Sequence, residues 1–213
     1  MSLPLDFALL AGWQLWLLWL FWIVCLLGAS HLTHRWLFNS QLGTLYRFII
    51  APGVIWHELA HAIMVIVTGN QLLEVNFWSA EGGYVRHRNR YQGLMAALTN
   101  FLIALAPLPL TFIAWWFIYQ RLDILAVWQL ILIAYFLVIS LATLAPSSTD
   151  WRVGLEFSSL ILIIGSLLSL SPWGQEIFVR SVPSLELAWF WTVRTVLPVM
   201  LVMGGISRLL PRR

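Results

Sequence analysis

The sequence PGVIWHELAHAIMVIVTG, residues 52–69, places two histidines and one glutamate inside an otherwise apolar segment. On an α-helix, residues i and i+4 lie one above the other, so His57 and His61 can offer two imidazole nitrogens to one metal ion. Glu58 then projects beside them, where its carboxylate can take a proton from a water molecule. Ionisable groups are costly within a membrane span, so we interpret this His-Glu-x-x-His pattern as a metal site.

The composition predicts an integral membrane protein. The 213 residues are 61% hydrophobic and 10% charged, whereas soluble domains are roughly 45–50% apolar and about 25% charged. We expect residues 1–213 to form one domain, an all-α polytopic membrane protein with about six transmembrane helices. The net charge of +3 comes from dispersed arginines, which is typical of membrane-flanking residues and argues against nucleic-acid binding. Cys25 is the only cysteine, so a thiolate metal site is not expected.

The apolar runs and their breaks predict where the helices begin and end. The expected spans cover about residues 7–29, 45–68, 94–119, a fourth ending near 145, a fifth ending near 170, and 187–209. A polar connection containing His31 should follow the first span, and a loop containing Pro172 should precede the sixth. Pro52 should kink or restart the second span, and Gly69 should end it.

Residues 71–90 interrupt the apolar pattern between the second and third spans. Apolar and polar side chains alternate from Leu73 to Trp78, and a glycine-containing turn follows. This pattern predicts a short membrane-associated β-hairpin, with an ordinary loop as the alternative.

Arginine distribution predicts the orientation in the membrane. With six spans, both termini lie on one side, and seven arginines share that side: Arg86, Arg88, Arg90, Arg152, Arg208, Arg212 and Arg213. Four lie opposite: Arg35, Arg47, Arg121 and Arg180. Because cytoplasmic loops carry the excess of basic residues, we expect both termini in the cytoplasm.

A catalytic zinc ion usually takes three protein ligands and one water, so a third ligand is needed. The acidic residues and histidines expected on the face where the second span ends are Glu74, Glu81, His87, Asp150 and Glu156. Asp150 is the best placed because it begins a helix directly after a Pro-Ser-Ser-Thr turn, and Glu156 is the next candidate. Ser147 and Asp150 also fit a capping box, so a purely structural role is the alternative for Asp150.

Together these features resemble the site-2 protease family of intramembrane zinc metalloproteases. The matching pieces are the His57–His61 motif, a following strand-like segment with glycines, Asn100 in the next span, and Asp150 at a later helix start. The chain has Ser148-Thr149-Asp150-Trp151 where family members commonly have Leu-Asp-Gly, which suggests a divergent, compact member.

The resemblance implies Zn²⁺ held by His57, His61 and Asp150, with Glu58 activating water. It also implies a hairpin beside the site and substrate-positioning roles for four further residues: Asn100, Gly82, Gly83 and Tyr84. The expected activity is hydrolysis of peptide bonds in or near the membrane-spanning segments of substrate proteins. The bilayer would be a bacterial-type inner (plasma) membrane.

Two other functions are compatible with parts of the sequence. A divalent-cation transporter would also place histidines and carboxylates in a membrane, but the outer halves of these spans are almost uniformly apolar. A catalytically silent scaffold with the same fold would not need Glu58.

Overall fold

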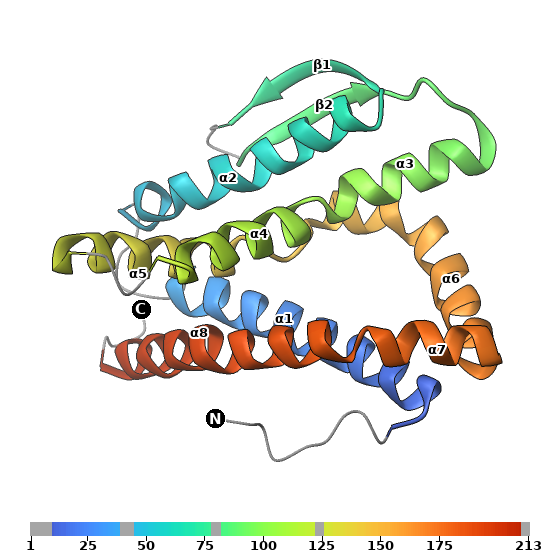
Figure 1. The fold of residues 1–213 in the computed structure, drawn as a ribbon. Coiled ribbons are helices and arrows are strands. Elements are labelled where there is room, and N and C mark those ends of the chain that lie inside the picture. The colour runs from blue at the N-terminus through green and yellow to red at the C-terminus, as the bar shows by residue number, and fades with distance from the viewer. Residues whose placement is uncertain (1–9, 39–44, 78–81, 122–125, 210–213) are drawn as a thin grey trace.

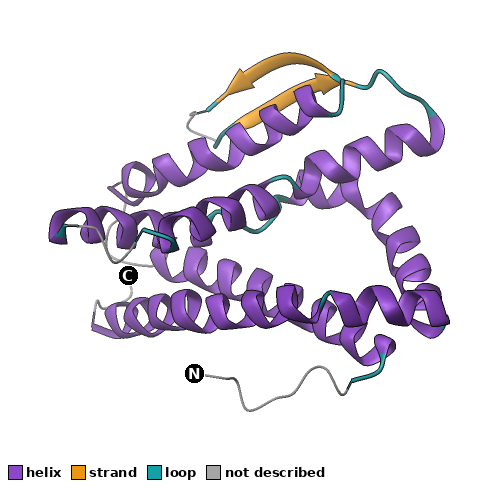
Figure 2. Ribbon diagram, viewed as in Figure 1, coloured by secondary structure: helices purple, strands orange, loops and turns teal. Residues whose placement is uncertain are grey.

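The computed structural model describes residues 10–38, 45–77, 82–121 and 126–209, which are mostly helical (Figures 1 and 2). In chain order the elements are α1 (Gly12–Phe38), α2 (Leu45–Val67), β1 (Gln71–Asn76), β2 (Tyr84–Arg88), α3 (Gly93–Leu105), α4 (Pro107–Tyr119), α5 (Val127–Ala142), α6 (Ser148–Leu170), α7 (Pro172–Arg180) and α8 (Val182–Leu209). The helices pack around a mainly apolar interior, and the two strands lie over α2 at one end of the molecule (Figure 1).

Two of the described helices are long and apolar enough to cross a membrane, namely α2 and the part of α1 from Gly12 to Trp36. The number rises to four if each of two bent pairs counts as one span. One pair is α3 and α4, which meet at Ala106 with a bend of 42°. Pro107 begins α4, and proline at this position accounts for the bend, since it cannot donate a hydrogen bond to the preceding turn. The expected count of about six spans is not confirmed for the described residues.

Three boundaries differ from the sequence-based expectation. Helix α1 continues through His31, which therefore lies in a helix rather than in a connection. Helix α7 replaces the loop expected around Pro172, because the Ser171 hydroxyl accepts a hydrogen bond from Gly174 N and proline suits the first helical turn. Helix α2 runs through Pro52 without restarting.

The end of α2 and the hairpin that follows are confirmed. Gly69 adopts φ 73°, which favours glycine, and its N–H donates to Ile66 O while Asn70 N–H donates to Val65 O. Strands β1 and β2 then pair antiparallel, with a register shift between Leu72 and Glu74. The buried Asn70 accepts a hydrogen bond from Arg90 N just after β2. The base of the hairpin is therefore tied to the end of α2.

The largest apolar cluster joins α1, α4, α5 and α8, and α1 and α8 run side by side (Figure 1). Its fully or nearly buried members are Trp22, Leu26, Ala29, Trp115, Leu141, Leu144 and Val196. Its two buried tryptophans donate indole N–H bonds to Thr192 on α8 and Ser140 on α5. This cluster fixes α5 relative to the rest of the helices.

Helices α2 and α5 approach most closely at Gly53. A Cβ atom there would lie 2.7 Å from the backbone oxygen of Ile139, closer than real Cβ atoms come to such neighbours. The Thr143 hydroxyl donates to Gly53 O at 3.1 Å, one helical turn further along α5. This close approach brings the Thr143 carbonyl to His57, one turn further along α2.

We expect Gly53→Ala to lower stability, because the methyl group must push α5 away; overpacking typically costs about 1–3 kcal/mol. The matched control is Gly28→Ala in α1, where a Cβ meets nothing within 4 Å. That change should be neutral or stabilising by up to about 1 kcal/mol, since alanine is the better helix former. Thermal unfolding in detergent micelles measures both, and equal shifts in the two variants would contradict the close crossing.

Candidate metal centre

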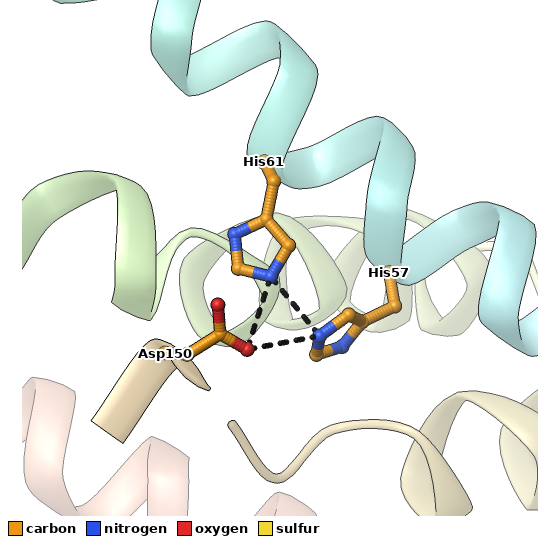
Figure 3. A group of neighbouring side chains, drawn as sticks. All are labelled: His57, His61 and Asp150. Atoms are coloured by element: carbon orange, nitrogen blue, oxygen red, sulfur yellow. Dashed lines mark hydrogen bonds and ion pairs between the residues drawn. The ribbon is translucent and has the colours of Figure 1, made fainter. Parts of the chain in front are cut away.

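Three side chains from two helices converge on one point (Figure 3). His57 and His61 project from successive turns of α2, and Asp150 comes from the first turn of α6. The two Nε2 atoms are 3.0 Å apart. The Oδ2 atom of Asp150 lies 3.7 Å from Nε2 of His57 and 3.5 Å from Nε2 of His61. Both histidines are buried and the aspartate is half-buried, so the group could hold a metal ion.

Backbone carbonyls fix both imidazole rings. Nδ1 of His57 is 2.5 Å from the carbonyl oxygen of Thr143, the residue directly after α5, and Nδ1 of His61 is 2.7 Å from that of Ile103 on α3. A carbonyl oxygen only accepts hydrogen bonds, so each Nδ1 carries the proton and donates it. In the neutral rings both Nε2 atoms then keep a lone pair, and these face each other and the carboxylate. Such an arrangement is repulsive unless a positive charge lies between the three atoms.

The separations suit a tetrahedral metal ion. Two ligand atoms about 2.0–2.2 Å from one zinc ion at the tetrahedral angle are roughly 3.4 Å apart. The three observed separations run from 3.0 to 3.7 Å around that value. Imidazole nitrogen and carboxylate oxygen are ligands that zinc and neighbouring divalent metals accept. Three protein ligands also leave a fourth position for water or substrate.

The capping role of Asp150 is present and is compatible with a role as a metal ligand. Its Oδ2 accepts a hydrogen bond from Ser147 N at 2.8 Å, and its own N–H donates to the Ser147 hydroxyl at 3.2 Å. This reciprocal pair is the capping box. The cap holds the carboxylate at the start of α6, and the same oxygen faces the two histidines. The capping hydrogen bonds therefore hold the Asp150 carboxylate next to His57 and His61 and do not turn it away from them.

Glu58 lies beside this group in a pocket of about 190 Å³. The residue is 8% exposed and lines the pocket together with His61 and Asp150. Gly83 packs directly against it, since a Cβ at Gly83 would lie 2.4 Å from Cγ of Glu58. The strand that follows the glycine thus forms one wall of the pocket over the carboxylate.

The other predicted site residues are distributed unevenly around the pocket. Asn100 of α3 and Gly83 line it, and so does Tyr84, although the Tyr84 hydroxyl donates to Glu74 at 2.7 Å. Gly82 is exposed and does not line the pocket.

The remaining candidates for the third ligand have other positions. Glu74 pairs with Arg86 at 3.3 Å, and His87 contacts Asn100 rather than the metal group. The side chain of Glu156 and all of Glu81 lie outside the described residues.

Two features of the site are not predicted in the sequence analysis. The carbonyls of Thr143 and Ile103 orient the histidines, but any residue type can supply a carbonyl. The contact between His87 and Asn100 also went unpredicted, because His87 stands within an arginine-rich run that suggests a solvated strand. A signal existed in the alternation of the strand, which turns Val85 and His87 to one face and Arg86 to the other.

We expect His61→Ala and Asp150→Asn to lose the bound metal. Mutating a residue that only hydrogen-bonds to a metal ligand typically lowers metal affinity by about 10–100-fold, so removing a ligand itself should lower it at least as much. The side-chain oxygen of asparagine can still accept the hydrogen bond from Ser147 N, so Asp150→Asn should keep its fold. Ser147→Ala is the control, because it weakens the cap by about 1 kcal/mol and leaves the carboxylate in place. Elemental analysis of dialysed protein checks all three variants, and unchanged metal in Asp150→Asn would remove Asp150 from the site.

Comparison with known proteins supplies no function for this site. No protein-family model, no curated protein and no solved structure matches the chain. The function is therefore argued from the geometry of the site and the chemistry of its residues.

Proposed function

We propose that the chain is an intramembrane zinc metalloprotease of the site-2 protease type, which hydrolyses peptide bonds in or near membrane-spanning segments of other proteins. The observation that carries the proposal is the convergence of His57, His61 and Asp150, two of which, His61 and Asp150, line the same pocket as Glu58. Two imidazoles and one carboxylate leave a ligand position open, as in zinc enzymes that activate water. A catalytically silent scaffold would need no carboxylate such as Glu58 in this pocket.

The residues divide the reaction between binding and proton transfer. His57, His61 and Asp150 would hold the ion, which when bound supplies a Lewis acid that polarises the scissile carbonyl and acidifies water. Glu58 takes one proton from the attacking water while the water oxygen forms a bond to the carbonyl carbon. The carbon–nitrogen bond then breaks, and Glu58 passes that proton to the leaving amine nitrogen. Water and peptide bond thus give one carboxyl and one amino terminus.

Strand β2 gives the site a means of binding an extended chain. A peptide within a helix has its carbonyls hydrogen-bonded and covered by side chains, so a substrate span must unwind before attack. Among the described residues, β2 and the glycine before it line the pocket, whereas β1 does not. An unwound peptide can add to a strand edge through main-chain hydrogen bonds. Pairing along β2 would lead the peptide past Glu58.

The location of the enzyme follows from its apolar helices and its arginines. Two to four described helices are long and apolar enough to span a membrane. We propose a bacterial-type inner membrane with both chain termini in the cytoplasm, which places the hairpin and its arginines on the cytoplasmic side. Membrane-protein substrates would then approach the site laterally from the bilayer.

We expect Glu58→Gln to reduce cleavage by about 10²–10⁴-fold, because glutamine cannot accept the water proton. Metal content should stay unchanged, since Glu58 is not a ligand in the proposal. The matched control is Glu176→Gln. This exposed glutamate on α7 forms an ion pair with Arg180, and the activity of the variant should equal that of the parent protein. Release of fluorescence from quenched casein, an unfolded general substrate, measures the rate in detergent micelles.

Two outcomes of the casein assay would contradict the proposed function. Full activity in Glu58→Gln would exclude the carboxylate as the base. A metal-loaded parent protein with no activity on casein or on a single-span membrane substrate would favour the scaffold.

The proposed orientation of the chain in the membrane can be tested separately. Reporter fusions placed after Arg90 and after Arg121 should report opposite sides of the membrane, with the first in the cytoplasm. The reason is that α3 and α4 together would form one crossing between these positions. If both fusions report the same side, the bent pair does not cross the bilayer.

A further inference from the structure

His87 is the histidine of strand β2 that turns toward the pocket. Neighbouring side chains in the strand alternate between two faces. Tyr84 and Arg86 meet Glu74 of β1 on one face, at 2.7 and 3.3 Å. Val85 and His87 line the pocket on the other face. The imidazole is half-buried, although both arginines beside it are exposed.

Its partner is the side chain of Asn100 on α3. Nε2 of His87 lies 3.3 Å from Oδ1 of Asn100. Asn100 also lines the pocket, on the same face of α3 as Ile103, whose carbonyl holds His61. The contact therefore joins the hairpin to α3 about one helical turn from the Ile103 carbonyl that holds His61.

The hydrogen-bonding capacity of the pair follows from its geometry. An amide oxygen accepts hydrogen bonds, so the His87 ring must carry its proton on Nε2 and donate it to Asn100. With Oδ1 engaged in this way, the NH₂ group of Asn100 keeps two donors for other partners. A peptide carbonyl oxygen is the group that such donors bind. Without the histidine, the amide is free to turn over and present its oxygen instead.

We propose that His87 is a positioning residue, which holds the Asn100 amide so that its NH₂ group binds a main-chain carbonyl of an extended peptide. The proposal rests on the proposed peptidase function and deepens it by adding a substrate-binding device between the hairpin and α3. The ligand class is any unfolded or unwound polypeptide, because a main-chain carbonyl carries no side-chain information. His87 acts through Asn100 and does not touch the reacting atoms.

Kinetics with quenched casein test the pair. We expect His87→Ala and Asn100→Ala each to lower kcat/KM by about 3–10-fold, the effect of one lost hydrogen bond, mainly through KM. The double variant should be no worse than the poorer single variant, because the two side chains act as one unit. His87→Gln should recover most of the loss, since its side-chain N–H can donate to Asn100. His31→Ala, an exposed histidine on α1, should match the parent protein.

A binding measurement separates this inference from the proposed function. In the Glu58→Gln background, fluorescence anisotropy of dye-labelled, reduced casein should show a Kd that His87→Ala raises about 3–10-fold, with metal content unchanged. If the parent protein cleaves casein and Glu58→Gln does not, parent-like kinetics and binding in His87→Ala would overturn the role of His87 alone. Additive losses in the double variant would overturn it as well. If the parent protein neither cleaves nor binds casein, the peptidase function fails and this inference fails with it.

Discussion

The site depends on two hydrogen bonds from imidazole Nδ1 atoms to backbone carbonyls. Helix spacing alone puts His57 and His61 on one face, but the rings could still rotate. The carbonyls of Thr143 on α5 and Ile103 on α3 fix them with both Nε2 atoms facing the same point. The bond from His57 is possible because Gly53 lets α5 approach α2 closely. Helix packing at Gly53, one turn before His57, thus determines how the His57 ring faces His61 and Asp150.

The hairpin completes the pocket from the other side. Gly83 packs on Glu58, and Asn70 ties the base of the hairpin to the end of α2. Only glycine fits over the carboxylate, because a Cβ would overlap its side chain. Gly83 and the Glu58 side chain are therefore in contact, and under the proposed function a peptide paired with β2 would be presented directly to Glu58. Binding and catalysis would then share a single structural element.

Local patterns made much of this predictable from sequence. The i, i+4 histidines, the glycine that ends α2 and the alternating strands all follow from the geometry of one element, and the structure contains each of them. Asp150 was ambiguous, because capping and ligation call for the same residue at the same helix start. The structure shows that the oxygen that accepts the capping hydrogen bond also lies 3.5 Å from Nε2 of His61, so the two roles are compatible. The span count failed to emerge because apolar composition does not reveal where a helix bends, as between α3 and α4, and α7 was missed because its proline and glycine resemble a loop.

X-ray absorption at the zinc edge of the purified protein tests the central claim most directly. Two imidazole nitrogens and at least one oxygen should be found at about 2.0–2.2 Å from the metal, in a four-coordinate site. The imidazole signal should fall by half in His61→Ala if any metal is retained. A protein without zinc after reconstitution, or zinc bound with fewer than two imidazoles in the parent protein, would contradict the account.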